Sequence, residues 1–183
     1  MKLPFRYKLN RLRTWLVIGW YRLTGPPRIL RFSSPLNKAI LRAFGARVGR
    51  DCCVFSPITL HNCKGTYRNL AIGDGCVLNG NHFLDISAPI TLERGVSLGP
   101  GVIIMTHNGY NHNVFLEKAL SHTIGFKPVL IREGAGIKAG ALITMGVVIG
   151  RNAVVAGNAV INRDVPDNNF VAGVPARLVK ALN

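Results

Sequence analysis

Residues 131–165 read IREGAGIKAGALITMGVVIGRNAVVAGNAVINRDV, and this stretch repeats with a period of six residues. Each repeat begins with an aliphatic residue, has Gly, Asn or Asp at its fourth position, and has a slender residue at its fifth. The aliphatic column consists of Ile131, Ile137, Ile143, Ile149, Val155 and Ile161. The turn column consists of Gly134, Gly140, Gly146, Asn152, Asn158 and Asp164, and the slender column of Ala135, Ala141, Val147, Ala153, Ala159 and Val165. Three columns that stay in phase over six repeats indicate a repetitive architecture.

A period of six fits neither a long helix, which repeats every 3.6 residues, nor a long strand, which repeats every 2. It fits a very short strand followed by a corner, because Gly, Asn and Asp tolerate positive φ in tight turns. Three such hexads would close a triangular coil of about 18 residues, and coils would stack about 4.8 Å apart. The pattern therefore predicts an all-β fold of the parallel β-helix type.

The bulk composition is that of one folded domain of 183 residues. The four cysteines lack CxxC spacing and are interpreted as reduced thiols; they are Cys52, Cys53, Cys63 and Cys76. No apolar run approaches the roughly 18 residues that a membrane span needs, and the N-terminus does not have the pattern of a signal peptide. We therefore expect a cytoplasmic protein.

The positive charge of the chain is concentrated at its N-terminus. The net charge is +15, and residues 1–50 hold 12 Lys or Arg and no Asp or Glu. Helical spacing there predicts two short amphipathic helices. The first has an apolar stripe of Leu9, Leu12, Leu16, Trp20 and Leu23, with Trp15 and Tyr21 beside it. The second has Ser33 or Ser34 as its cap, Pro35 in its first turn, an apolar face of Leu36, Ile40, Leu41 and Phe44, and Gly45 at its end.

Two interpretations of this basic segment stay open at the level of sequence. The helices could pack on the β-helix or on a neighbouring subunit, with the arginines in solvent. Alternatively, they could attach the protein peripherally to an anionic membrane surface. Nucleic acid is not an expected partner, because the basic residues do not accompany a recognisable nucleic-acid-binding fold.

Hexads also occur before residue 131, but they are interrupted. They begin at Val48, lose register through residues 63–69, resume at Ile72, and slip by two residues near Ile86. In the shifted phase the turn column reads Gly95, Gly101 and then His107, so a histidine is expected at a corner with its side chain pointing outward. Residues 108–128 contain no hexads and are predicted to form an external loop that carries His112 and His122. This organisation divides the chain into a helical extension (1–47), a β-helix (48–166) and a C-terminal tail (167–183).

Three segments resemble the hexapeptide-repeat acyltransferases: the repeats themselves, MTHNGYNH (105–112), and NRDVPDNNFVAGVPARLVK (162–180). The segment LRAFGARVG (41–49) is similar to the branch of colanic-acid-type O-acetyltransferases in exopolysaccharide synthesis. The resemblance implies a left-handed β-helix, a homotrimer, and transfer of an acetyl group from acetyl-CoA to a hydroxyl group of a sugar or glycan.

The resemblance also implies a catalytic histidine. Thr106-His107, with Phe115 eight residues later, matches the position in the exopolysaccharide branch, whereas the string NGYNH selects His112. On the acceptor side, the family's asparagine matches Asn79 or Asn81. Asp85 stands one residue out of register with the family's acceptor carboxylate.

For coenzyme A, the resemblance implies a pantetheine groove between subunits. The matching positions are Ala139, Gly157 and Asn162 along the groove, with Arg163, Arg177 and Lys180 near the adenosine phosphates. Gly136-Ile137-Lys138 stands where the family has its WIG motif.

These residue types suit acyl transfer, because a neutral imidazole can remove the proton of an acceptor hydroxyl as it attacks a thioester. Arginine suits the phosphates of coenzyme A. We therefore expect a sugar O-acetyltransferase of surface polysaccharide synthesis that needs no metal. Two alternatives stay open: a zinc enzyme of the γ-carbonic anhydrase type using His82, His107 and His112, and a non-catalytic scaffold with a membrane-binding arm.

Overall fold

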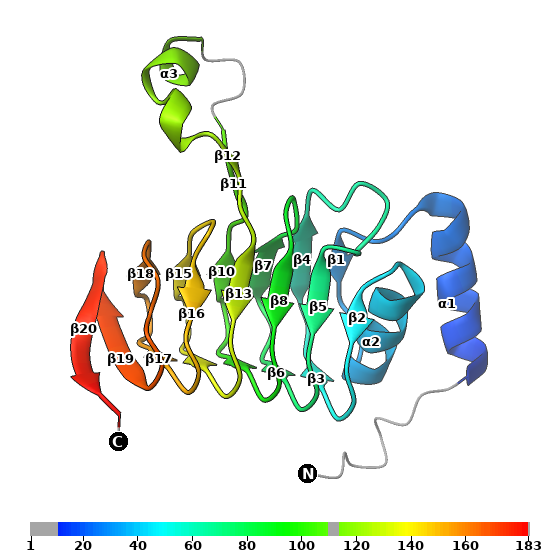
Figure 1. The fold of residues 1–183 in the computed structure, drawn as a ribbon. Coiled ribbons are helices and arrows are strands. Elements are labelled where there is room, and N and C mark those ends of the chain that lie inside the picture. Colours follow the sequence, from blue (N-terminus) through cyan, green and yellow to red (C-terminus); the bar gives the residue numbers. More distant parts are fainter. Residues whose placement is uncertain (1–10, 110–113, 183) are drawn as a thin grey trace.

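The computed structural model describes residues 11–109 and 114–182, which form a solenoid of stacked triangular coils with two helices at its N-terminal end (Figure 1). Three sheets make the three faces. The first face contains β1 (Ile29–Leu30), β4 (Ile58–His61), β7 (His82–Asp85), β10 (Ile103–Ile104), β15 (Leu142–Ile143) and β18 (Val160–Ile161). The second contains β2 (Arg47–Val48), β5 (Leu70–Ile72), β8 (Ile90–Leu92), β13 (Val129–Ile131) and β16 (Val148–Ile149). The third contains β3 (Cys53–Val54), β6 (Val77–Leu78), β9 (Ser97–Leu98), β14 (Gly136–Ile137), β17 (Val154–Val155), β19 (Asn169–Gly173) and β20 (Ala176–Ala181).

The six-residue columns have the structural roles that the sequence predicts. Every residue of the aliphatic column from Ile131 to Ile161 is at most 1% exposed, and the slender column is also buried. Parallel ladders hold the coils in register, as in the pairing of Ile104 with Ile143 and of Ile143 with Ile161. The stacked columns therefore make up the core. Burial of one aliphatic side chain contributes about 1.5–3 kcal/mol to the stability of the fold.

Five of the six residues in the turn column have positive φ, between 52° and 81°. Asp164 is the exception, and the expectation for it was wrong. Its carboxylate instead accepts a hydrogen bond from the backbone N–H of Val148, at 2.8 Å, and the left-handed residue of that coil is Asn168. The last coil therefore turns differently from the others, where the chain leaves the hexad pattern. Strand β19 then pairs with β17, so residues assigned to the tail extend the third sheet.

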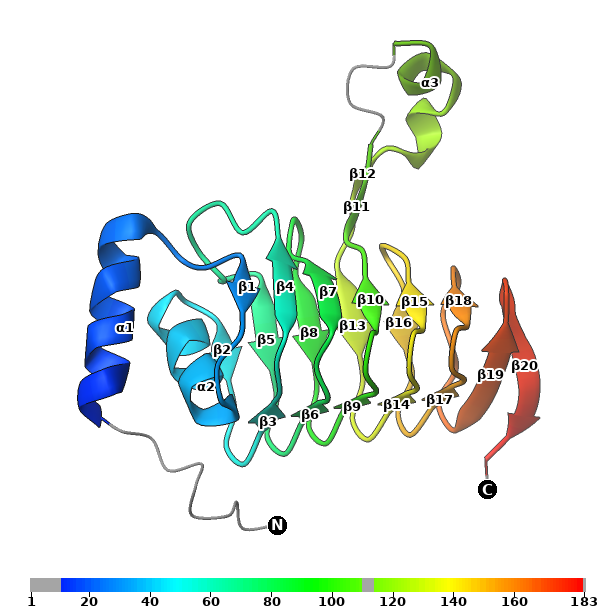
Figure 2. The same ribbon diagram turned by 180° about the vertical axis from the view of Figure 1, so that it is seen from behind.

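Residues 107–128 leave the solenoid as the predicted external loop. A two-stranded antiparallel ribbon, β11 (His107–Asn108) and β12 (Gly125–Phe126), carries α3 (Val114–Ala119) and a short 3₁₀ helix (Ser121–Thr123) away from the coils (Figure 2). His107 therefore begins an extended strand rather than occupying a left-handed corner, which corrects that expectation. The coils on either side still stack, because β10 pairs with both β7 and β15.

The first interruption of the hexads, residues 62–69, forms a loop between β4 and β5. Tyr67 fills the space beneath this loop: it is fully buried, packs edge-on against Phe44 with 5.8 Å between ring centroids, and donates a hydrogen bond to the carbonyl of Pro27 at 2.5 Å. Burial raises the pKa of its hydroxyl, so the group stays a neutral donor. The interruption thus anchors the N-terminal extension to the coils.

The two predicted helices are present as α1 (Arg11–Thr24) and α2 (Ser34–Ala43). Leu36, Ile40 and Leu41, which belong to the predicted apolar face of α2, are buried against the first coil. Ser33 occupies the N-cap position without a side-chain cap hydrogen bond, whereas the hydroxyl of Ser34 accepts from the backbone N–H of Val54 at 2.8 Å. Helix α2 therefore closes the N-terminal end of the core.

Helix α1 packs through a face other than its predicted apolar stripe. Thr14 is buried, and Val17, Ile18 and Tyr21 are partly buried against the rest of the chain. The leucines and tryptophans of the stripe that lie within the described residues point to solvent. Within the described ranges, no helix is both long and apolar enough to cross a membrane.

Candidate active site

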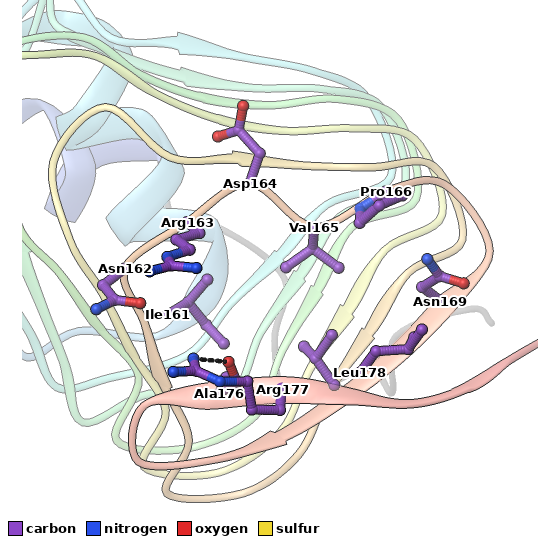
Figure 3. A pocket seen from close by; sticks show the side chains of 11 residues that line it. Ile161, Asn162, Arg163, Asp164, Val165, Pro166, Asn169, Ala176, Arg177 and Leu178 are labelled. Atoms are coloured by element: carbon purple, nitrogen blue, oxygen red, sulfur yellow. Dashed lines mark hydrogen bonds between the residues drawn. The ribbon is translucent and has the colours of Figure 1, made fainter.

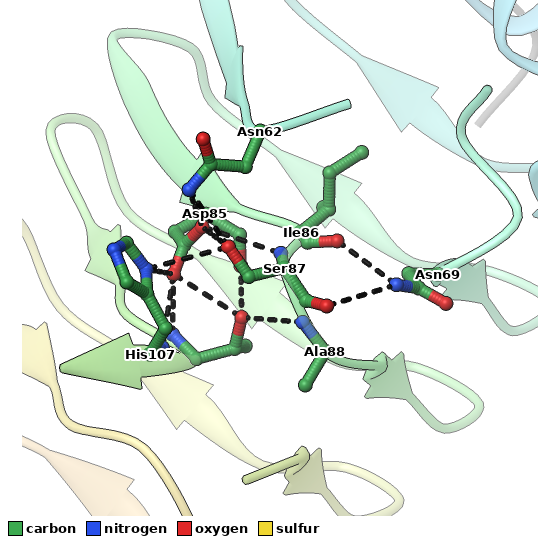
Figure 4. A network of polar contacts seen from close by, with 8 residues as sticks. Asn62, Asn69, Asp85, Ile86, Ser87, Ala88 and His107 are labelled. Carbon is green, nitrogen blue, oxygen red and sulfur yellow. Dashed lines mark hydrogen bonds and ion pairs between the residues drawn. The ribbon is translucent and has the colours of Figure 1, made fainter. Parts of the chain in front are cut away.

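The edge where the first face meets the second, which we call the 1–2 edge, carries a carboxylate–imidazole pair. Asp85 ends β7, and His107 follows the next strand of the same face, β10. Because β7 and β10 are neighbours, Nδ1 of His107 lies 2.5 Å from Oδ2 of Asp85 (Figure 4). The two residues form an Asp–His dyad on a rigid ladder.

Asp85 is completely buried, and both of its carboxylate oxygens accept hydrogen bonds. Oδ2 accepts from the backbone N–H groups of Thr106, at 2.9 Å, and His107, at 3.0 Å. Oδ1 accepts from the hydroxyl of Ser87 at 2.6 Å and from the amide of Asn62 at 3.3 Å. Burial alone would raise the pKa of this carboxyl, but the hydrogen bonds from Ser87, His107 and Thr106 outweigh it and lower the pKa to about 2. Asp85 is therefore an anion at neutral pH.

The two-residue phase slip near Ile86 builds this network. It places Ser87 and Ala88 at the corner directly after Asp85, where the backbone N–H of Ala88 donates to the hydroxyl of Thr106 at 2.9 Å. The hydroxyl of Thr106 donates in turn to the backbone carbonyl of Asp85 at 2.7 Å. The irregular corner thus joins the two coils that hold the dyad.

The imidazole of His107 is held between two rings. It stacks on His61, with centroids 6.0 Å apart, and on Phe126, with centroids 5.9 Å apart, and its side chain is 24% exposed. The ionised Asp85 assigns the proton of the neutral ring to Nδ1, since only an N–H can donate to a carboxylate. Nε2 then keeps a lone pair and can accept a proton from a bound molecule.

A cleft lies on each side of this pair of stacked histidines. The first, of about 440 Å³, is lined by Met105, His107, Asn108, His122, Thr123, Lys127, Thr144 and Met145. The second, of about 430 Å³, is lined by Thr24, Gly25, Pro26, Arg28, His61, Asn62, Cys63, Lys64 and Gly65. The first faces the C-terminal coils and the second faces the N-terminal extension, so His107 and His61 stand between two separate clefts.

The other acceptor-side predictions lie elsewhere. Asn79 and Asn81 are exposed at the corner that precedes β7, on the edge where the third face meets the first (the 3–1 edge). The side chain of Asn79 donates to the carbonyl of Leu98 at 2.9 Å, and Asn81 adopts a left-handed turn with φ 55°. Within one chain they are not brought to His107. Asp85 was predicted to contact the acceptor, and the structure places it behind His107, out of contact with solvent. His112 lies outside the described residues.

The predicted coenzyme A positions also divide between edges. Ala139 and Gly157 are stacked on the 3–1 edge, where the N–H of Asn158 donates to the carbonyl of Ala139 at 2.9 Å. A Cβ atom added to Gly157 would lie 3.2 Å from that carbonyl, so this corner exposes backbone where a side chain would crowd it. Asn162 and Arg163 lie on the 1–2 edge, two coils beyond His107.

Asn162, Arg163 and Arg177 border a pocket of about 180 Å³ beside the β19–β20 hairpin (Figure 3). Arg177 is exposed there and donates to the carbonyl of Ala176 at 2.9 Å. Lys180 lies further along β20, opposite Phe170, and is exposed. The two arginines are therefore near each other at the C-terminal end of the solenoid.

Four contributors to the site escaped the sequence analysis: Asn62, His61, Ser87 and Phe126. The only sequence signals for them were the interruption at 63–69 and the slip near Ile86. Over residues 11–109 and 114–182, no group of three or more His, Cys, Asp or Glu is placed to hold a metal ion. His82, named in the zinc alternative, is buried inside the solenoid at the start of β7, away from the outward-facing His107.

Comparison with solved structures defines the class of the fold. A hexapeptide-repeat acetyltransferase from Vibrio cholerae O1 biovar eltor, solved with acetyl-CoA, is 29% identical, with a TM-score of 0.71 over 94% of this chain and 88% of that one. A galactoside acetyltransferase in complex with coenzyme A is 23% identical, with a TM-score of 0.70 over 94% of this chain and 80% of that one. A maltose O-acetyltransferase from Clostridium difficile 630 is 23% identical, with a TM-score of 0.62 over 94% and 88%.

No protein-family model and no curated protein sequence matched the chain. The structural neighbours nevertheless confirm the resemblance drawn from the sequence and the left-handed parallel β-helix that it implied. The chain has the fold of the hexapeptide-repeat acetyltransferases.

Proposed function

We propose that this protein transfers an acetyl group from acetyl-CoA to a hydroxyl group of a sugar, with His107 as the general base. The observation that carries the proposal is the Asp85–His107 contact of 2.5 Å, with the imidazole held between His61 and Phe126 and clefts on both sides. An anion fixed behind a neutral imidazole orients the ring and stabilises the imidazolium that forms when it accepts a proton. The same arrangement argues against a non-catalytic scaffold, which has no use for it.

The reaction needs no covalent enzyme intermediate. Nε2 of His107 removes the proton of the acceptor hydroxyl as its oxygen attacks the thioester carbonyl carbon. Collapse of the tetrahedral intermediate breaks the carbon–sulfur bond, and the imidazolium returns the proton to the departing thiolate. The products are an acetyl ester and coenzyme A. Asp85 acts as a positioning residue, because it touches only His107 and its surrounding network.

The residues present fit coenzyme A. The exposed backbone at Ala139 and Gly157 can lie along an extended pantetheine chain, since a side chain at Gly157 would crowd the Ala139 carbonyl. Arg163 and Arg177, with Lys180 further along β20, supply cations for the phosphates. We assign the cleft of His107, Lys127 and Thr144 to the donor, because it faces the coils that carry these residues.

The division of predicted residues between two edges supports a homotrimer. His107, Asn162 and Arg163 lie on the 1–2 edge, whereas Asn79, Ala139 and Gly157 lie on the 3–1 edge of the same chain. These groups can act on one pair of substrates only if the 1–2 edge of one copy meets the 3–1 edge of the next. Three copies around an axis parallel to the solenoid would form three such sites.

We assign the acceptor to the cleft of Arg28, His61, Asn62 and Lys64, whose amide, imidazole and cationic groups can hydrogen-bond a glycan. The similarity of residues 41–49 to the exopolysaccharide branch points to a surface polysaccharide or its precursor. We infer that this role is carried out in the cytoplasm, where the exposed side chains of α1 can contact the inner face of the membrane.

The test is a coenzyme A release assay over a panel of sugar nucleotides and lipid-linked glycans. Wild-type protein should release coenzyme A only with acetyl-CoA and an acceptor, and His107→Ala should lose the acceptor-dependent rate. Protein that neither binds coenzyme A in a thermal-shift experiment nor turns over any acceptor would contradict the proposal.

A further inference from the structure

Helix α1 has two faces with opposite environments. Thr14, Val17, Ile18 and Tyr21 face the rest of the chain. The opposite side, which we call the outer face of α1, is between 63% and 86% exposed and consists of Leu12, Trp15, Leu16, Trp20 and Leu23. One exposed leucine on a protein surface is ordinary, but five large apolar side chains on one short helix mark an interaction surface.

The charge around the outer face identifies the chemistry of its partner. Arg13 and Arg22 of α1 are exposed, and so are Arg28 and Arg31 just beyond the helix. Residues 1–50 contain no acidic side chain. Tryptophan and leucine flanked by arginine suit the boundary between lipid headgroups and acyl chains, where the rings enter the interface and the cations meet phosphate. An apolar groove of a protein would match the leucines but would leave this uniform charge without a partner.

The position of α1 in the fold suits a flat surface. The helix stands across the N-terminal end of the solenoid, at the opposite end from the β19–β20 hairpin (Figures 1 and 2). The cleft assigned to the acceptor begins at its C-terminal end, at Thr24, Gly25 and Pro26, and reaches His61 beside His107. In the proposed trimer all three α1 helices would lie at the same end, and three weak attachments would act together.

We propose that the outer face of α1 docks the protein on an anionic lipid bilayer, with the helix lying in the plane of the interface. The 14 residues of α1 span about 21 Å along the helix, whereas a bilayer core is about 30 Å thick, so the helix lies on the membrane and does not cross it. This attachment deepens the proposed function, because it brings the acceptor cleft close to substrates that are themselves lipid-linked.

Intrinsic tryptophan fluorescence can report on this surface. It contains two tryptophans, Trp15 and Trp20, and both lie on the outer face of α1. The experiment mixes the full-length protein with vesicles of phosphatidylcholine alone, or with about one-third phosphatidylglycerol, and measures co-flotation and tryptophan emission. Co-flotation and a blue shift are expected with the anionic vesicles, and added salt should weaken both.

The decisive variant is Leu16→Glu/Trp20→Glu, which removes two apolar anchors and adds two negative charges. The matched control is Val114→Glu/Val174→Glu, which makes the same charge change at exposed apolar residues elsewhere. The first variant should bind anionic vesicles at least roughly tenfold more weakly than wild type, and the control should stay within about twofold. Coenzyme A release with water-soluble acceptors should be the same in both variants, which separates this proposal from the proposed function.

Four outcomes would overturn the proposal. The first is absence of wild-type binding to either vesicle, and the second is equal weakening by both variants. The third is a change in oligomeric state when only the outer face is altered, which would make this face an interface between copies of the chain. Equal binding to neutral and anionic vesicles would likewise contradict the role given to the arginines.

Discussion

The two halves of the solenoid share one lattice but differ in regularity. Residues 131–165 repeat without interruption, whereas residues 48–128 contain an inserted loop, a two-residue slip and a protruding ribbon. All three irregularities lie on the 1–2 edge, and all three contribute residues to the candidate site: Asn62 and His61 near the first, Ser87 from the second, and His107 and Phe126 from the third. Regular coils therefore provide stiffness, and chemistry is added where the repeat is broken at one edge.

The lattice tolerates these breaks because they occur at corners. The ladder of β4, β7, β10, β15 and β18 runs through both halves without a gap. A corner insertion costs little loop-closure entropy while the strands on both sides keep their hydrogen bonds.

The largest difference should be in activity. Asp85→Asn leaves the shape of the site intact but removes the charge that fixes the tautomer of His107, so acceptor-dependent coenzyme A release should fall by roughly 10³–10⁴-fold. Asp167→Asn is the control, because Asp167 lies just beyond the regular hexads and its carboxylate also accepts from a backbone N–H, that of Arg151 at 2.7 Å. Its rate should stay within about threefold of wild type, and similar losses in both variants would remove the distinction between the halves.

Truncation of a core isoleucine should lower the free energy of unfolding by a similar amount in both halves. Ile104 and Ile143 are fully buried and pair across β10 and β15, on opposite sides of the protruding loop. Replacing either with Ala should lower the free energy of unfolding by about 2–5 kcal/mol, measured by denaturant titration. A much smaller cost for Ile104→Ala would mean that the interrupted half is loosely packed.

Lowering the pH should destabilise the protein through a histidine of the interrupted half. His82 is buried, its Nε2 accepts from the N–H of Gly80 at 3.1 Å, and burial lowers its pKa to about 4. The unfolded chain therefore binds more protons than the folded one between about pH 6.5 and pH 4, so stability falls as the pH is lowered through that window. A shift of this size corresponds to about 3 kcal/mol.

His82→Gln should remove most of this dependence, because glutamine can still accept from Gly80 but does not titrate. The regular half contains no histidine. If wild type and His82→Gln lost stability equally between pH 6.5 and pH 4, another group would be responsible.

The smallest contrast concerns turn glycines. Gly140 in the regular half has φ 69°, and an added Cβ would meet the Asn158 side chain at 2.2 Å. Gly65 in the inserted loop has φ 79° and open space around it. Gly140→Ala should cost about 2 kcal/mol in thermal unfolding, and Gly65→Ala only the backbone term of about 1 kcal/mol. Equal losses of stability in the two variants would show that contact with the next coil adds nothing to the penalty for positive φ at Gly140.

Periodicity predicted the fold because every coil obeys the same local rule. It identified the core columns, the external loop and His107 as the exceptional residue. It did not identify Asp85 as the partner of His107. The two residues meet because neighbouring coils stack in a particular register after the slip near Ile86, and a repeat pattern within one coil does not contain that information. Helical spacing likewise detected the apolar stripe of α1, but not that another face of the helix, at Val17 and Ile18, makes the contact. That choice depends on tertiary packing.

The role of His107 as general base is tested most directly by comparing His107→Ala and His112→Ala in the coenzyme A release assay, with the best acceptor of the panel. Both residues are candidates from the sequence; His107 is joined to the buried Asp85, whereas His112 lies outside the described residues. We expect a loss of about 10²–10⁴-fold for His107→Ala and a change of less than about threefold for His112→Ala. Full activity in His107→Ala together with loss in His112→Ala would contradict that role.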